Sequence, residues 1–178
     1  GPKELGRFIS QITYDRDQNL WLATKGAGVI KVDEGKFQEG TQSILPSRVY
    51  SSANSPVGDF VTSIYTANKG SIWIGYWNKG LGRINPSTGE VQNYTKIHSA
   101  RKEAELDLKK YPIVVLSESI DGQRIWAGTR GNGVFELSYD SDTDSLLLVN
   151  HFYQDSADSS SLSNNFVNCF VPAENGDM

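Results

Sequence analysis

Residues 61–85, VTSIYTANKGSIWIGYWNKGLGRIN, form a unit that is repeated along the chain, and the repeat indicates the fold. Three other segments repeat it in order: residues 9–33, residues 113–137 and, for the opening of the unit only, residues 166–178. Trp73 falls on Trp21 at a spacing of 52 residues and on Trp126 at a spacing of 53, with one extra turn residue in the later copy. A period near 50 residues is typical of propellers and solenoids.

Each copy reads as a series of short strands joined by polar turns. In the first copy the expected order is a strand at 9–14, a turn at 15–19, a strand at 20–24, a glycine-bearing loop at 25–28 and a strand at 29–32. A more variable fourth strand follows in every copy. Four strands in each unit of about 50 residues favour a β-propeller over a helical solenoid. The sequence therefore predicts an all-β fold of three four-stranded blades, with the first strand of a fourth blade at 166–171.

Tryptophan and glycine recur at fixed places in the unit. Each tryptophan is followed two positions later by a small residue: Trp21 by Ala23, Trp73 by Gly75 and Trp126 by Gly128. A large ring beside a small residue lets neighbouring sheets pack closely, so we expect the three tryptophans to be buried between sheets. A second set of glycines consists of Gly28, Gly80 and Gly133. These predict a bend or bulge in the backbone.

Composition excludes several classes of protein. The 178 residues carry a net charge of −4, so no basic field is available to attract a phosphate backbone. Cys169 is the only cysteine, which leaves no intrachain disulfide. No apolar run approaches the roughly 20 residues of a membrane span. Gly1 and Pro2 resemble the remnant of a cleaved tag.

The motifs resemble the two-component regulator propeller repeat. The residues that carry the resemblance are 61–64, 72–75 and 80–84, and residues 151–158 running into 161–167 resemble the inter-blade spacer of that family. The resemblance implies a fragment of a larger, seven-bladed propeller in the periplasmic sensor region of a bacterial membrane-spanning regulator. In such proteins the output domain is a histidine kinase or a diguanylate cyclase. Many members sense oligosaccharides released from polysaccharides.

The repeat also sets the expected boundaries along the chain. They are 1–7 tag remnant and lead-in, 8–40 blade one, 41–59 inserted loop, 60–95 blade two, 96–111 insertion, 112–153 blade three, 154–165 linker and 166–178 start of blade four. Within the second insertion, residues 99–110 contain good helix formers. They predict a short helix with Ala104 and Leu108 on one side.

Catalytic and metal motifs are incomplete. Asp15, Asp17 and Asn19 have the spacing that opens a calcium loop, and a similar series begins at Asp140, but both lack the later glycine and glutamate. His98 and His151 have no cysteine or carboxylate at zinc-ligand spacing. No serine lies in a nucleophile motif. We therefore expect no catalytic residue, no metal and no cofactor.

The loops between the second and third strands are the better candidates for a ligand site, because in propellers they open on the face of the blade-to-blade connections. They contain Lys25, Tyr76, Trp77, Asn78, Lys79, Arg130 and Asn132. A flat ring covers the apolar face of a sugar, while charged and amide donors bind its hydroxyls. Trp77 is the central candidate. The alternative interpretation is that these seven residues are ordinary exposed loop residues that bind no ligand.

Three functions are compatible with these features. The first is a non-catalytic module that binds a small molecule or oligosaccharide and passes its occupancy to an output domain elsewhere. The second is a propeller lyase or hydrolase, and the third is a scaffold that docks another protein. We expect the remaining blades or self-association to cover the end sheets, no nucleic-acid partner, a periplasmic location, and membrane attachment only through a span outside this segment.

Overall fold

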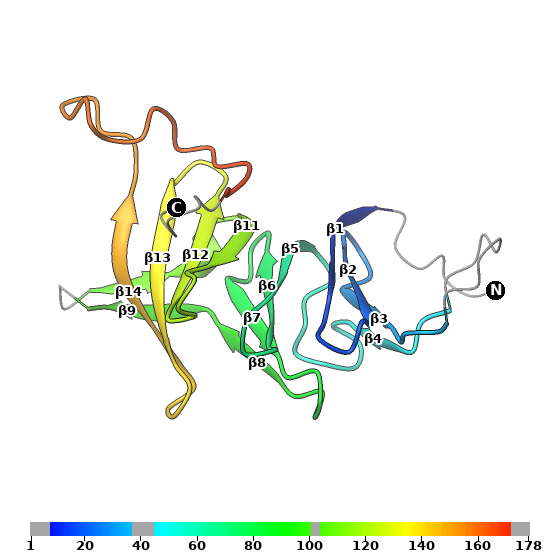
Figure 1. Cartoon of the computed structure of the whole chain (residues 1–178). Coiled ribbons are helices and arrows are strands. Elements are labelled where there is room, and N and C mark those ends of the chain that lie inside the picture. The colour runs from blue at the N-terminus through cyan, green and yellow to red at the C-terminus, as the bar shows by residue number, and fades with distance from the viewer. Residues whose placement is uncertain (1–7, 37–44, 101–103, 172–178) are drawn as a thin grey trace.

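The protein is an all-β molecule in which sheets follow one another in chain order (Figure 1). The computed structural model describes residues 8–36, 45–100 and 104–171. The elements are β1 Ile9–Tyr14, β2 Leu20–Thr24, β3 Val29–Val32, β4 Arg48–Tyr50, β5 Val61–Thr66, β6 Ile72–Tyr76, β7 Leu81–Ile84, β8 Val91–Tyr94, β9 Lys96–Ser99, β10 Glu105–Asp107, the 3₁₀ turn η1 Leu108–Lys110, β11 Ile113–Glu118, β12 Arg124–Thr129, β13 Val134–Asp140 and β14 Ser145–Phe152. Within these ranges no helix is long and apolar enough to cross a membrane.

Each copy of the repeat forms one antiparallel sheet. Sheet one has the order β1-β2-β3-β4 and sheet two the order β5-β6-β7-β8. Sheet three has the order β10-β9-β14-β13-β12-β11, so a hairpin is added to its outer edge. The first strand of each sheet contains a bulge at the same position of the repeat, between Ile9 and Gln11 in sheet one. The all-β class is confirmed, and the blade number of a complete propeller stays a prediction.

The fourth strand of sheet one lies inside the predicted inserted loop 41–59. Strand β4 is only three residues long, and Val49 pairs with Ile30 while Tyr50 pairs with Val29. The surrounding Ser, Pro and Asn residues favour a loop, but the outer edge of β3 needs backbone partners and β4 supplies them. The loop prediction was therefore wrong for Arg48–Tyr50.

The predicted helix at 99–110 is replaced by a hairpin. Strand β9 lies parallel to β14, and the amide of Ala100 donates to the carbonyl of Leu148 at 2.8 Å. Among the described residues of the segment, only η1 has helical geometry, and Leu108 is fully buried while Ala104 is exposed. Helix propensity is a weak preference, and the open edge of β14 outweighs it by satisfying the backbone groups of β9.

The sheets are held together by apolar faces that pack on the next sheet. Trp21 is fully buried in a cluster with residues of sheet two, among them Ile64 and Ile74. Trp73 is 1% exposed and packs edge-on against Tyr139 of sheet three, with ring centroids 5.1 Å apart. The prediction that these two tryptophans lie buried between sheets is therefore confirmed.

Hydrogen bonds between the innermost strands repeat with the same period. Ser10 Oγ donates to the carbonyl of Val61 at 2.9 Å, and Thr62 Oγ1 donates to the carbonyl of Ile113 at 2.6 Å. These donors occupy the same position in successive copies. Sheets one and two are thus related to each other as sheets two and three are, which is the relation that blades of a propeller have.

The fourth copy of the repeat begins in register but forms no regular strand among its described residues. A Cβ on Gly75 would lie 2.8 Å from Ile113 Cγ2, and a Cβ on Gly128 would lie 2.8 Å from Val167 Cγ1. Val167 therefore stands against sheet three as Ile113 stands against sheet two. Phe166 makes a single bridge to Arg130, and residues 167–171 form no strand, so the strand expected at 166–171 was wrong for these residues.

Gly28 is required by a close approach between the third and fourth strands of sheet one. Its φ is +76°, and a Cβ there would lie 2.0 Å from the carbonyl oxygen of Tyr50. Gly80 and Gly133 approach the fourth strands of their own sheets in the same way, at the carbonyl oxygens of Tyr94 and Phe152. The predicted backbone role of these glycines is confirmed. Gly35 has nearly the same φ, +78°, but no described residue places an atom within 4 Å of an added Cβ there.

Gly28→Ala should destabilise the protein more than Gly35→Ala. Both substitutions place an L side chain in the left-handed region, which costs about 1 to 2 kcal/mol. Only Gly28→Ala also forces the carbonyl of Tyr50 to move and disturbs the pairing of β3 with β4. Urea unfolding of the two variants measures the difference. Equal losses would show that the close approach is not needed.

Asp144 joins the outer parts of sheets two and three. Its carboxylate accepts hydrogen bonds from the hydroxyls of Tyr94 and Tyr139, and from Arg83 Nη2 at 2.9 Å. Burial raises the pKa of Asp144, but the two hydroxyls and the Arg83 charge prevail, so its pKa lies below the ordinary value of 3.8. The ionised carboxylate is therefore the form that stabilises this contact.

The stability contributed by Asp144 should be lost in acid. A carboxylate with a lowered folded-state pKa contributes fully above its unfolded pKa, and the contribution falls as the pH drops through the folded value. From about pH 6 to about pH 3, the unfolding free energy of Asp144→Asn should therefore fall less than that of the unsubstituted protein. Asp142→Asn, on the same turn, is the control for net charge. An unchanged acid dependence in Asp144→Asn would contradict this role.

Candidate ligand-binding site

A pocket of about 410 Å³ lies where the loops of three successive sheets meet. Its lining consists of Lys25, Phe60, Thr62, Trp77, Asn78 and Arg130. Lys25 follows β2, Trp77 follows β6 and Arg130 follows β12, so each sheet contributes the residue after its second strand. Four of the seven residues predicted from the sequence are brought together here. We call this the Trp77 pocket.

The three loop residues occupy one position of the repeat, and the backbone holds each in the same way. The amides of Lys25, Trp77 and Arg130 donate to the carbonyls of the residues that precede the first strands of their sheets, at 2.9, 3.3 and 2.9 Å. Lys25 also bridges Phe60 of the following copy, as Arg130 bridges Phe166. The main-chain hydrogen bonds thus fix the backbone position of each residue. The side chains at these three positions differ: a lysine, a tryptophan and an arginine.

Trp77 and Arg130 are in contact across two sheets. The guanidinium carbon of Arg130 lies over the indole ring, 5.6 Å from its centroid. Trp77 is 42% exposed and Phe60 is 61% exposed, although both are large and apolar. Two exposed aromatic side chains beside an arginine form a surface that can stack on a flat apolar ligand face.

The charge in the Trp77 pocket is positive although the chain as a whole is acidic. Lys25 and Arg130 are its only ionisable lining residues, and within the described residues neither forms an ion pair. The nearest acidic residue in sequence to Phe60 is Asp59, whose carboxylate accepts from the amide and hydroxyl of Ser52. The pocket therefore offers two cationic groups to a ligand.

The other three predicted residues lie outside the pocket. Tyr76 is buried, its hydroxyl donates to Asn93 Oδ1 at 3.0 Å, and burial raises its pKa. Lys79 Nζ donates to the carbonyl of Pro56 at 2.6 Å. The carbonyl of Asn132 lies 2.8 Å from His151 Nε2, in a different pocket. Tyr76 and Lys79 therefore serve packing and loop contacts. Tyr76 is the last residue of β6, a strand that is buried along its whole length, whereas Trp77 is the first residue beyond that strand and is exposed.

Phe60 and Thr62 were missed by sequence reasoning. They come from the start of sheet two, at and just before β5, rather than from the loops between second and third strands. The repeat contained a signal, because Phe8, Phe60 and Phe166 precede the first strands of three copies and all three are exposed. This recurrence could have marked Phe60 as part of the exposed surface beside these loops.

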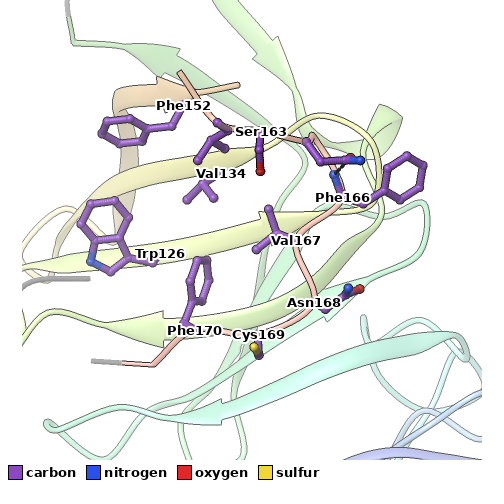
Figure 2. A pocket seen from close by; sticks show the side chains of 11 residues that line it. Trp126, Val134, Phe152, Ser163, Phe166, Val167, Asn168, Cys169 and Phe170 are labelled. Atoms are coloured by element: carbon purple, nitrogen blue, oxygen red, sulfur yellow. Dashed lines mark hydrogen bonds between the residues drawn. The ribbon is translucent and has the colours of Figure 1, made fainter. Parts of the chain in front are cut away.

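A second, more apolar pocket of about 550 Å³ lies on the outer face of sheet three (Figure 2). Trp126 and Phe152 lie on one side of it, and Val167 and Phe170 lie on the other. The Trp126 and Phe152 ring centroids are 5.9 Å apart, as Trp21 and Tyr50 are 5.8 Å apart in the buried core between sheets one and two.

That second pocket is the unfilled counterpart of an inter-sheet core. Trp126 is only partly buried, which corrects the prediction that all three tryptophans are enclosed. Its indole nitrogen is buried without a hydrogen-bond partner in the described residues, whereas Trp21 Nε1 donates to Asp15 Oδ2 at 2.8 Å. The first two copies are covered by a following sheet, and no such sheet lies over Trp126 in the described part of the chain.

The calcium-like spacing near Asp15 has a structural role. The carboxylate of Asp15 accepts hydrogen bonds from the amides of Asp17 and Asn19 and from the indole N–H of Trp21. Burial raises the pKa of Asp15, but these hydrogen bonds outweigh it and the pKa lies below its usual value. Across residues 8–36, 45–100 and 104–171, no three histidine, cysteine or acidic side chains are grouped as metal ligands would be.

The chain is similar in fold to extracellular domains of bacterial regulatory systems. One neighbour, from B. thetaiotaomicron, is the extracellular domain of BT4673, described as a one-component system; it is 17% identical, with a TM-score of 0.59, and the match covers 99% of this chain. Another structure of BT4673, described as a hybrid two-component system, is 19% identical with a TM-score of 0.55 over 99% of this chain.

The extracellular domain of the hybrid two-component system BT3049, from the same organism, is 20% identical with a TM-score of 0.53 over 83% of this chain. The matches span 26% of each BT4673 chain and 18% of the BT3049 chain, so this chain corresponds to about a quarter or less of their length. At these identities the similarity shows a shared fold. The chain matches no protein-family model and no curated protein.

Trp77 should be quenched more strongly by iodide than by caesium. A chain with a net charge of −4 attracts cations on average, but Lys25 and Arg130 reverse the sign around this ring. Steady-state tryptophan fluorescence with the two quenchers tests the local charge. Trp77→Phe should remove the preference for iodide, and Trp126→Phe should keep it. Equal quenching by both ions would contradict a cationic pocket at Trp77.

Proposed function

We propose that this chain is part of the extracytoplasmic sensor region of a bacterial signal-transduction receptor and that the Trp77 pocket binds an oligosaccharide without catalysis. The observation that carries the proposal is the convergence of Lys25, Trp77 and Arg130, one from each of three sheets, in a single pocket. Lys25, Trp77 and Arg130 occupy the same repeat position and make the same main-chain hydrogen bond. That hydrogen bond does not require a particular side chain, so we infer that the three different side chains serve the surface that they form together.

The chemistry of the lining favours a saccharide. The faces of a pyranose carry C–H groups that stack on an aromatic ring, and its edges carry hydroxyls that accept and donate hydrogen bonds. Trp77 and Phe60 offer exposed rings, and Asn78, Lys25 and Arg130 offer donors around them. The volume of about 410 Å³ lies in the range of small-ligand sites, about 300 to 1,000 Å³.

A binding role is supported over catalysis by the lining itself. Thr62 is its only hydroxyl-bearing residue, and its Oγ1 lies 2.6 Å from the carbonyl of Ile113 and 3.0 Å from that of Gly75. No histidine or carboxylate in the lining stands beside that hydroxyl as a base. The fold shared with extracellular domains of regulatory systems supports the sensor role and the periplasmic location.

Trp77→Ala and Arg130→Ala should weaken oligosaccharide binding by about tenfold or more, since each removes a stacking or hydrogen-bonding group worth about 1 to 2 kcal/mol. The probes are neutral galacto-, manno- and xylotriose together with trigalacturonate, titrated by calorimetry. Lys79→Ala is the matched control, because Lys79 lies beside the pocket but donates to Pro56. Unchanged affinity in both pocket variants, or no binding of any saccharide, would overturn the proposal.

A further inference from the structure

We infer that the Trp77 pocket selects an acidic saccharide, with a uronate carboxylate bound between Lys25 and Arg130. This inference rests on the proposed function and narrows it to one class of sugar. Its basis is the charge of the lining, which holds two cations and no acidic side chain in a chain whose acidic residues outnumber its basic ones, 21 to 17. A neutral ligand would leave both positive charges without a partner.

The cations are available to a ligand because neither has a carboxylate partner among the described residues, although the guanidinium of Arg130 lies over the Trp77 ring. In the described residues, two other arginines of these sheets have carboxylate partners: Arg83 pairs with Asp144 at 2.9 Å and Arg124 with Glu136 at 3.2 Å. Lys25 and Arg130 form no such pair, although each is anchored at its backbone amide. An arginine that is structurally fixed but electrostatically unpaired is suited to receive an anion.

The position of Arg130 over Trp77 links stacking to charge recognition. A sugar ring that stacks on the exposed part of the indole would lie next to the guanidinium, since that group is 5.6 Å from the ring centroid. A carboxylate attached to the sugar ring could then accept two parallel N–H bonds from Arg130, the geometry that guanidinium and carboxylate groups prefer. Lys25, which follows β2 of sheet one, supplies a second hydrogen-bond donor at the end of a flexible side chain.

A carboxylate fits this arrangement better than a hydroxyl alone. Charge-assisted hydrogen bonds are roughly twice as strong as neutral ones. Acidic sugars should therefore bind more tightly than neutral sugars of the same ring structure. Their advantage should shrink at high salt, because the pocket is open to solvent and its charges are screened.

The experiment compares sugars that differ only in charge. Trigalacturonate and a hyaluronan tetrasaccharide provide carboxylates, and their methyl-esterified or carboxyl-reduced forms provide the same rings without charge. A neocarrageenan oligosaccharide provides sulfate without carboxylate. Affinities are measured by calorimetry at low and at high salt, with the unsubstituted protein and with Lys25→Gln, Arg130→Gln and Lys79→Gln. Lys79→Gln removes the same charge outside the pocket and serves as the matched control.

We expect at least one carboxylate sugar to bind about tenfold or more tightly than its neutral form, and each of Lys25→Gln and Arg130→Gln to remove most of that preference. Lys79→Gln should keep it. Neutral forms that bind as tightly as acidic ones, with a dependence on Trp77 but not on the cations, would overturn the inference and leave the proposed function standing. Binding of the sulfate sugar alone would also overturn it. Absence of binding by every sugar would overturn both proposals.

Discussion

Close contact between neighbouring sheets is the constraint on which the rest of the structure depends. A Cβ on Gly75 would lie 2.6 Å from the carbonyl oxygen of Ile113, so the second strand of sheet two touches the backbone of sheet three. That approach is possible only where a small residue stands beside the large ring of Trp73. The ring fills the space that the small residue leaves, and both are completely covered. Each sheet has a face that combines a tryptophan with a small residue two positions later. Successive sheets therefore pack on one another with the same relative placement.

This placement is what creates the Trp77 pocket. When sheets are related by one repeated contact, the loops after their second strands fall side by side on the same face, however far apart they are in sequence. Lys25 and Arg130 are separated by two copies of the repeat, yet they line one pocket with Trp77 between them in sequence. The backbone hydrogen bonds that hold these loops use only main-chain groups, so the side chains are free to be chosen for a ligand rather than for stability.

Sequence reasoning succeeded where one residue fixes the register. The tryptophans and the glycines at Gly28, Gly80 and Gly133 locate the second and third strands of each sheet almost to the residue, because each has a steric reason to be there. It failed at β4 and at the β9–β10 hairpin. Those elements form because an outer strand has an open edge, and an open edge is a property of the assembled sheet that no local pattern contains.

The candidate site divides in a similar way. Lys25, Trp77, Asn78 and Arg130 could be predicted because they lie in loops whose place in the repeat is known. Phe60 and Thr62 were missed because they lie at the start of the first strand of sheet two, outside the loops that were searched. Tyr76 and Trp77 are neighbours in sequence, yet Tyr76 is 1% and Trp77 42% exposed. The difference arises because Tyr76 ends a strand that is covered on both faces, whereas Trp77 begins the loop beyond it.

A pocket assembled from three sheets has a consequence that a pocket within one sheet would lack. A ligand that contacts Lys25, Trp77 and Arg130 at once binds only when the three sheets keep their relative placement, so its binding free energy adds to the stability of both inter-sheet contacts. In a stack where each sheet touches only its neighbours, strain or stabilisation at one contact is passed on through the next. Under the proposed function, ligand binding in this pocket would therefore stabilise one relative placement of the three sheets.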